Sequence, residues 1–285
     1  ETGITSRLIK FCNLATGHMR GGLAQVSVLL SCLMGGISGS ATADAAMESR
    51  ILGPDMEKKG YSKGFTAAIL AMGGLITSTI PPSLGLILYG VTGEVSIGRL
   101  FLAGIVPGVL MTIILMFAVS RISQKRDYAP EREKIATLPE LLKGLIDNIW
   151  ALMFPVILIV GIRFGVFTPS EAGAFAVVYA LFVGMFVYRE LTVKKLIECL
   201  ATTAVDLSVI MFIIICSNAF GYAIVTGQLP QSLASFIVKL SDNKYVILTI
   251  VMLFVFVVGM FMEATANVLL LTPIFLPIIV SYGFD

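Results

Sequence analysis

Charged residues are scarce in this sequence. Asp, Glu, Lys and Arg make up 13% of its 285 residues, against about 25% in an ordinary soluble domain. Histidine occurs once, as His18, and the four cysteines have no CxxC spacing, so we expect neither a metal site built on His and Cys nor a disulfide framework. Because a Walker A motif is also missing, we do not expect the chain to hydrolyse ATP.

Apolar residues dominate instead. They make up 57% of the chain, and the mean hydropathy is +0.94. Several apolar runs reach the roughly 20 residues that a membrane-spanning helix needs. The sequence therefore predicts an all-α polytopic membrane protein. Full-length crossings are expected at residues 65–90, 100–120, 146–164, 172–188 and 203–225.

Residues 35–42 (GGISGSAT) separate two short apolar runs, residues 23–34 and 43–52. Each run is only about half as long as a membrane-spanning helix. Three glycines and three hydroxyl residues in eight positions disfavour a continuous helix. We predict a re-entrant hairpin over residues 22–54, because irregular backbone at membrane depth is tolerated only where it is buried in protein or lines a polar cavity.

A second interruption lies in the middle of the apolar segment 65–90. Residues 73–83 read GGLITSTIPPS. Pro81 and Pro82 lack backbone donors, and a proline disfavours helix in the residue before it. We therefore predict a broken helix, with two half-helices joined by an unwound segment near mid-membrane.

The two interruptions together favour a binding site. Backbone carbonyls and hydroxyl groups at broken helices suit a dehydrated Na⁺, and the N-termini of half-helices suit a carboxylate. The alternative is that the small residues only allow close helix packing. The available hydroxyl side chains are Ser38, Ser40, Thr42, Thr77, Ser78, Thr79 and Ser83.

An internal repeat emerges when the start of the chain is shifted by 224 residues, so that Gly35 coincides with Gly259. A second hairpin is then expected over residues 245–280, with its tip at 260–265, and the chain ends where the next broken helix should begin.

The predicted domains are an interfacial arm (1–20), a first repeat (21–120: hairpin 22–54, broken helix 65–90, helix 100–120), a cytoplasmic connector (121–145), scaffold helices (146–225) and the start of a second repeat (226–285: arm 229–240, hairpin 245–280).

Charge placement predicts the orientation of the repeats. If both hairpins return to their own side, one face carries residues 1–20, 50–63, 121–143 and 189–195, with 16 of the 20 Lys and Arg residues. The positive-inside rule makes that face cytoplasmic. Five full crossings separate the hairpins, so the first should open to the cytoplasm and the second to the periplasm. Such an inverted repeat is typical of secondary transporters.

Three acidic residues lie at membrane depth in this scheme. Asp44 and Glu48 are four residues apart and share one helix face, and Glu263 lies in the second tip beside Thr265. Carboxylates at this depth are costly and usually functional. Glu48 has an alternative reading, as a partner of Arg50 or as a residue that reaches the interface.

The tetrapeptide Gly36-Ile37-Ser38-Gly39 also fits the nucleophile motif of rhomboid intramembrane proteases. A serine nucleophile needs a base within reach. The single histidine, His18, lies outside the predicted span, so we expect a protein that is not an enzyme.

Four segments in order resemble the large membrane subunit (DctM-like permease) of TRAP transporters, the tripartite ATP-independent periplasmic transporters. They are residues 36–44 (GISGSATAD), 80–83 (IPPS), 168–172 (TPSEA) and 259–265 (GMFMEAT), and the pair Gly60-Tyr61 between the first two also fits. The resemblance covers essentially the whole chain. It implies a multi-pass, elevator-type transporter in the bacterial inner membrane, driven by two or more Na⁺ ions and without an organic cofactor.

The same resemblance implies two partners and a substrate class. One partner is a small four-helix membrane subunit, separate or fused upstream, and the other is a periplasmic substrate-binding protein. Substrates of the family are small organic acids such as C4-dicarboxylates, sialic acid and keto acids. A stand-alone divalent-anion/Na⁺ symporter without a binding protein remains the alternative, and a non-transporting membrane scaffold a more remote one.

The resemblance also implies site residues. The substrate carboxylate would face Ser38 and Ser83, with Glu263 beside the substrate. Two departures from the usual family pattern are Ala41, where some members have a polar residue, and Glu263-Ala264, where Asp-Pro is frequent. The Na⁺ ligands would be Ser38, Gly39, Ser40, Thr77, Ile80 and Pro81 at a first site, and Met262 and Thr265 at a second.

Overall fold

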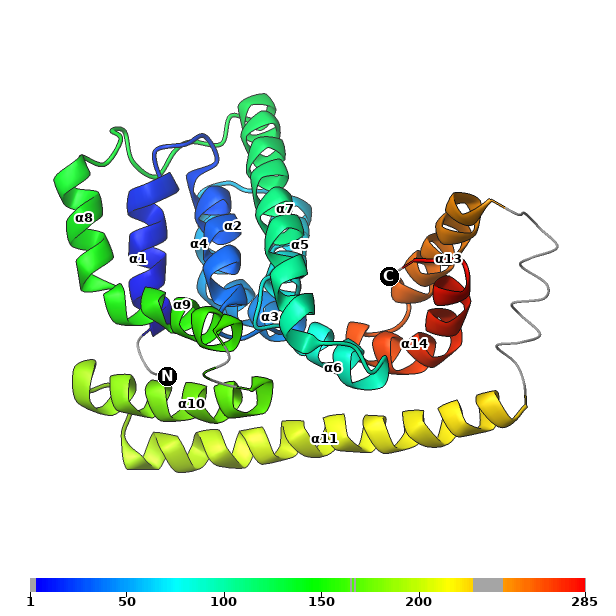
Figure 1. Cartoon of the computed structure of the whole chain (residues 1–285). Coiled ribbons are helices and arrows are strands. Elements are labelled where there is room, and N and C mark those ends of the chain that lie inside the picture. Colours follow the sequence, from blue (N-terminus) through cyan, green and yellow to red (C-terminus); the bar gives the residue numbers. More distant parts are fainter. Residues whose placement is uncertain (1–3, 165, 167, 228–242, 285) are drawn as a thin grey trace. The chain divides into compact units, whose positions relative to one another are not determined.

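The computed structural model describes residues 4–164, 166, 168–227 and 243–284, and all regular elements among them are helical (Figure 1). This confirms the predicted all-α class. The helices are α1 (Ile4–Thr16), α2 (Gly22–Gly35), α3 (Ala41–Ile51), α4 (Gly53–Lys58), α5 (Lys63–Thr79), α6 (Leu84–Thr92), α7 (Ile97–Arg126), α8 (Leu138–Asp147), α9 (Ile149–Arg163), α10 (Pro169–Phe182), the π-helix η1 (Val183–Val187), α11 (Val193–Thr226), α13 (Lys244–Gly259) and α14 (Ala264–Ser281).

The chain divides into two compact units. The first comprises Glu1–Leu86 and Ile97–Leu196, and the second comprises Ile87–Ser96 and Ile197–Asp285. Among the described residues, three helices are long and apolar enough to cross a membrane, or up to five spans if each of two bent pairs counts as one. The long crossing expected at residues 100–120 is α7, which extends from Ile97 to Arg126.

Helices α2 and α3 form the first hairpin. Its arms are joined by buried hydrogen bonds, because Ser27 and Ser31 of α2 both donate to Glu48 of α3. Helix α2 ends at Gly35 and α3 begins at Ala41, so the irregular tip is shorter than the eight residues predicted. Both arms pack against α5.

Helices α5 and α6 form the predicted broken helix, bent by 47° at residues 80–83. The break is narrower than the predicted segment 73–83, since α5 remains helical through Thr79. The glycines within it serve packing instead of unwinding. A Cβ on Gly73 would lie 2.4 Å from Ser31 Oγ, and a Cβ on Gly74 would lie 2.6 Å from the carbonyl oxygen of Ala41, so α5 lies directly against both arms of the hairpin.

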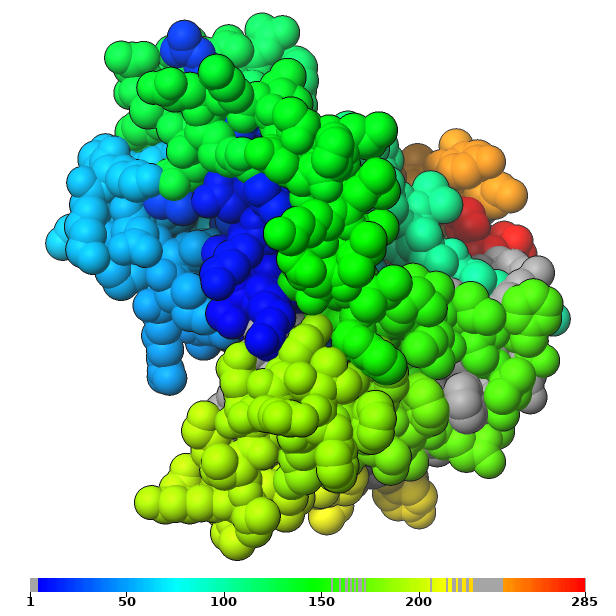
Figure 2. All heavy atoms as spheres, turned by 90° about the vertical axis from the view of Figure 1, so that its left-hand side faces the viewer, coloured from blue at the N-terminus to red at the C-terminus, as the bar shows by residue number. Residues whose placement is uncertain are grey.

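The core of the first unit gathers around α2. Fully buried side chains of α1 (Leu8, Cys12), α2 (Val26, Leu30) and α5 (Ile76) meet there. Helix α1 packs against both α2 and α8, and the space-filling view shows its dark-blue atoms beside the green atoms of α8 and α9 (Figure 2).

The crossing expected at residues 146–164 differs from the prediction. Helix α8 ends at Asp147, and the chain bends by 67° before α9 begins at Ile149. Asn148 lies at the bend, and its side-chain amide donates a hydrogen bond to the Gly144 carbonyl oxygen at 2.7 Å. A short polar side chain that competes for backbone partners in this way favours helix ends.

The range of the second predicted hairpin, residues 245–280, contains α13 and α14, which are joined by residues 260–263 and contact each other. Helix α14 has 18 residues and is by itself long and apolar enough to cross a membrane, so it is longer than the half-length arm expected there. Ile247 and Ile278 form its buried core, with Phe275 and Tyr282 packed against them. The predicted arm 229–240 lies outside the described residues.

Candidate functional site

The first hairpin tip contacts the break between α5 and α6. The Leu84 N–H donates a hydrogen bond to the Gly39 carbonyl oxygen at 3.2 Å. Gly39 has φ +58°, and a Cβ at this position would lie 2.3 Å from the Pro82 carbonyl oxygen. Glycine is therefore required for both the backbone conformation and the close approach. The structure thus brings together two of the interruptions that the sequence singled out.

Ser38, Ser40 and Ser83 have different surroundings at this contact. Ser40 Oγ accepts a hydrogen bond from the Ala43 N–H at 3.4 Å and caps α3. Buried Ser83 donates to the Ser78 carbonyl oxygen at 2.5 Å and accepts from the Leu86 N–H at 3.4 Å, so it caps α6. Ser38 is exposed, and its hydroxyl has no hydrogen-bond partner among the described residues. Of the three, only Ser38 has a hydroxyl without a partner among the described residues.

Asp44 lies one helical turn beyond the tip and is only 1% exposed. Its Oδ2 atom is 2.5 Å from Thr77 Oγ1, which is also 2.9 Å from the Ser31 carbonyl oxygen. Asp44 Oδ1 is buried and has no hydrogen-bond partner. A buried oxygen without a partner is unusual and indicates a missing donor, water or ion.

Glu48 is fully buried, one turn further along α3. It accepts hydrogen bonds from both Ser27 and Ser31, the latter at 2.8 Å. Arg50 is exposed and forms no ion pair with Glu48 in the described part of the chain, so the alternative pairing was wrong. Sequence reasoning missed the two serines. Their i, i+4 spacing in an otherwise apolar helix matches that of Asp44 and Glu48 and could have revealed them.

Glu263 caps the second hairpin. One carboxylate oxygen accepts hydrogen bonds from the N–H groups of Thr265 (2.7 Å) and Ala266 (3.3 Å), and the other accepts from the Thr265 hydroxyl (3.0 Å). This arrangement is a helix N-cap on α14. Glu263 itself is exposed, and Met262 is half-buried.

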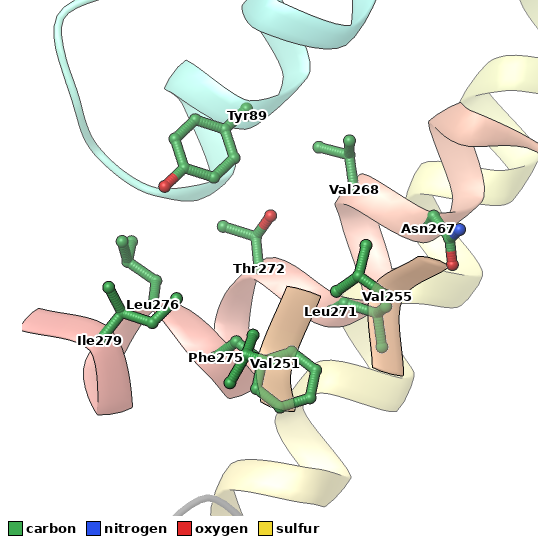
Figure 3. Close-up of a pocket in the computed structure, with 10 residues that line it drawn as sticks. All are labelled: Tyr89, Val251, Val255, Asn267, Val268, Leu271, Thr272, Phe275, Leu276 and Ile279. Carbon is green, nitrogen blue, oxygen red and sulfur yellow. The ribbon is translucent and has the colours of Figure 1, made fainter. Parts of the chain in front are cut away.

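An apolar cavity of about 230 Å³ lies below this tip within the second unit. Figure 3 shows Thr272 and Leu276 of α14 and Tyr89 of α6 around it. Asn267 contributes another polar side chain, and its Oδ1 atom is buried without a partner.

Two tyrosines in loops outside the membrane-spanning helices hold the segment that follows the first hairpin. The rings of Tyr61 and Tyr128 stack with centroids 4.3 Å apart. Burial raises the pKa of Tyr61 to about 12. Hydrogen bonding to Ser62, whose N–H donates to the Tyr128 hydroxyl oxygen at 3.1 Å, lowers the pKa of Tyr128.

The apolar helices, the bent pairs and the paired interruptions define a polytopic helical membrane protein. The family described as "Tripartite ATP-independent periplasmic transporter, DctM component" matches residues 1–285. The chain belongs to this family of transporter permeases, which is not a family of enzymes.

Relatives from three bacteria agree. The chain is 41% identical to a putative TRAP transporter large permease protein of Haemophilus influenzae, over 100% of this chain and 67% of the relative. It is 38% identical to the sialic acid TRAP transporter large permease protein SiaM of Vibrio cholerae (100% and 66%). It is 37% identical to the C4-dicarboxylate TRAP transporter large permease protein DctM of Pseudomonas aeruginosa (99% and 66%). The chain thus spans about two thirds of the length of these relatives.

Proposed function

We propose that the chain is the main part of a Na⁺-coupled importer of small organic acids in the bacterial inner membrane, supplied by a periplasmic binding protein. Family membership supports transport. The observation that carries the mechanism is the contact of Gly39 with Leu84, which joins the first hairpin tip to the start of a half-helix. Broken elements of this kind hold ions and substrates in secondary transporters.

The first Na⁺ would bind among backbone carbonyls and hydroxyl groups of the tip (Ser38–Ser40) and the break (Thr77, Ile80, Pro81). The buried Asp44 Oδ1 atom supports a cation here, since it lacks a donor and lies on the carboxylate that contacts Thr77. The described residues contain no cluster of three or more His, Cys, Asp or Glu side chains suited to a metal, and a hard monovalent cation needs none.

The substrate carboxylate would bind at the same contact. Ser38 offers a free hydroxyl, and the N-terminus of α6 offers backbone N–H groups and the positive end of a helix dipole. Ser83 is already bonded to Ser78 and Leu86, so its first role is to hold the α6 N-terminus in place. Ser83 would therefore contribute to substrate binding by positioning that N-terminus, or by accepting one further hydrogen bond.

The second hairpin would supply the second Na⁺ site through Met262 and Thr265, with Glu263 beside the substrate. Equivalent features in both hairpins support an inverted repeat. Helices α2 and α13 both end in glycine, at Gly35 and Gly259. The second arm of each hairpin is followed by a glycine with positive φ, Gly60 at +83° and Gly283 at +75°. In the proposed elevator mechanism the hairpin domain carries the site across the membrane, with the first hairpin open to the cytoplasm and the second to the periplasm.

The relatives support the substrate class and the partners. The substrates in their names are C4-dicarboxylate, sialic acid, 2,3-diketo-L-gulonate and isethionate, which are all small organic anions. The permease proteins DctMQ and SiaT are longer, and the chain covers only 44% and 46% of them. That extra length supports a small membrane subunit that is fused in some members and separate in others.

Uptake by proteoliposomes tests the proposal. We expect import of a small organic anion only when Na⁺, the small subunit and the binding protein are all present. Uptake without the binding protein would favour the stand-alone symporter, and the absence of any Na⁺-dependent uptake across a panel of acids would refute the proposal.

A further inference from the structure

A polar groove in the first unit lies apart from the hairpin and the broken helix. It has a volume of about 610 Å³ and lies among α1, the α8–α9 bend and the end of η1. Its lining combines two basic residues, one acid and three aromatic residues: Arg7, Lys10, Asp147, Phe11, Trp150 and Tyr188. Proteins use this mixture of charge and amphipathic rings at membrane interfaces.

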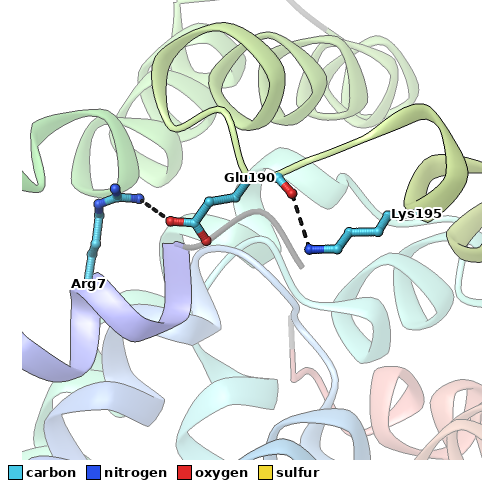
Figure 4. Close-up of polar contacts among 3 residues, drawn as sticks. All are labelled: Arg7, Glu190 and Lys195. Atoms are coloured by element: carbon cyan, nitrogen blue, oxygen red, sulfur yellow. Dashed lines mark hydrogen bonds and ion pairs between the residues drawn. The ribbon is translucent and has the colours of Figure 1, made fainter.

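Arg7 is fixed in the groove. Its guanidinium carbon lies 3.9 Å from the centre of the Tyr188 ring, and one nitrogen lies 3.2 Å from Glu190 Oε1. Lys195 holds the same loop by donating to the Glu190 carbonyl oxygen at 3.2 Å (Figure 4). A guanidinium has five N–H donors, so further donors remain for a ligand.

Lys10 lies one turn further along α1 and is exposed. It forms no hydrogen bond or ion pair with any residue that the structure describes. Asp147, on the opposite wall, is also exposed and also lacks an ion-pair partner there. The groove therefore presents an open cation and an open anion at the same time, which suits a ligand that carries both charges.

An apolar surface continues from the groove. Gly144 lets α8 approach α1 closely, since a Cβ there would lie 2.8 Å from Leu14. Several other apolar side chains of α8 and of the start of α9 are exposed. Leu142, Leu145, Ile146, Ile149 and Trp150 are all exposed.

We propose that this groove binds a phospholipid with a zwitterionic amine head group. Its phosphate would lie at Arg7 and Lys10, its ammonium group beside Asp147, and its acyl chains along the exposed apolar face of α8. Basic pockets at helix surfaces recognise lipid head groups in this way. The site would anchor α1 to the α8–α9 bend through a lipid, and it is independent of the proposed transport function.

A thermal-shift titration tests the site. The full-length protein, purified with any subunit that accompanies it and stripped of lipid, is titrated with phosphatidylethanolamine in mixed micelles. We expect stabilisation of the wild type and an apparent affinity about tenfold weaker for Lys10→Glu. Lys143→Glu is the matched control, because Lys143 is an exposed lysine of α8 that does not line the groove, and it should behave like the wild type. Equal affinity in the Lys10→Glu variant would overturn the proposal.

Two further experiments identify the molecule that binds in the groove. Inorganic phosphate and glycerophosphoethanolamine, which lack acyl chains, should not stabilise the protein, and stabilisation by either one equal to that by the lipid would overturn the proposal. A photo-crosslinking residue in place of Ile146, which lines the groove and is exposed, should label phospholipid in membranes. Labelling of a polypeptide instead would mean that a protein segment covers the groove and would equally overturn it.

Discussion

The main-chain N–H of Leu84 donates a hydrogen bond to the carbonyl oxygen of Gly39, 3.2 Å away. The first hairpin tip and the start of α6 are thereby joined backbone to backbone, without an intervening side chain. A change that displaces one partner should therefore disturb the other, and the first prediction rests on this coupling.

Replacing Gly39 by alanine should destabilise the protein by about 1–3 kcal/mol and abolish most uptake. The new Cβ would lie 2.3 Å from the Pro82 carbonyl oxygen, and φ is +58°. The apparent melting temperature in detergent and the uptake rate measure the two effects. Gly64→Ala is the control, because no atom lies within 4 Å of its Cβ position. A Gly39→Ala variant as active as the control would show that the close approach is dispensable.

Ser38→Ala and Ser83→Ala should both lower uptake, but for different reasons. Ser38 is exposed and unbonded, so its loss should raise the Na⁺ or substrate concentration for half-maximal uptake and leave the melting temperature unchanged. Ser83 caps α6, so its loss should also cost about 1 kcal/mol of stability. Ser49 donates only to the Ala46 carbonyl on the exposed side of α3, which makes Ser49→Ala the control. The assignment of Ser38 fails if its variant retains wild-type Na⁺ dependence.

Glu48→Ala should destabilise the first hairpin by about 2–4 kcal/mol. The substitution leaves the buried hydroxyls of Ser27 and Ser31 without their acceptor. Glu48→Gln retains the shape and one acceptor oxygen, so it should be much milder. Chemical denaturation in detergent measures both variants against Glu57→Ala, at an exposed position. Equal losses for Ala and Gln would mean that the negative charge itself matters.

Glu263→Ser separates the two roles of that residue. Serine is a good N-cap, so α14 should keep its first turn and the melting temperature should change little. The carboxylate that we propose to lie beside the substrate would nevertheless be gone, and we expect the apparent substrate affinity to change about tenfold. Glu263→Ala should lose stability as well, by about 1 kcal/mol. Wild-type transport kinetics in the Ser variant would leave Glu263 with only its capping role.

Na⁺ should raise the apparent melting temperature by about 2–4 °C at saturation, and K⁺ should not. Asp44→Asn should greatly reduce this shift, because the buried Asp44 carboxylate lies against Thr77 with one oxygen lacking a partner. A shift of full size in Asp44→Asn would place the cation elsewhere.

Much of the fold could be predicted from local signals. The proline pair at 81–82 and the glycine-rich first tip mark where helices stop, whatever the tertiary structure. The role of the α5 glycines in helix packing could not be predicted in the same way. Gly73 and Gly74 remain helical because α2 and α3 press against them, and a single sequence does not distinguish a glycine that breaks a helix from one that lets a neighbour approach.

The site could be predicted only in part for a related reason. The tip and the break were found from their composition, and their contact is present. The hydrogen bonds of Ser27 and Ser31 to Glu48 were missed, since two serines in an apolar helix resemble ordinary packing residues until the facing carboxylates are known. The bend at Asn148 was missed because one asparagine directly before an apolar run is a weak signal.

The direct contact of α5 with the hairpin has a mechanical consequence. At Gly73 and Gly74 no side chain of α5 separates it from Ser31 and Ala41, and the Thr77 hydroxyl of α5 bonds to both hairpin arms, at Ser31 and at Asp44. Sliding of α5 past α2 or α3 would break buried polar bonds and force backbone into backbone. The three helices should therefore travel as one rigid body, with any hinge placed in the segments that enter and leave them.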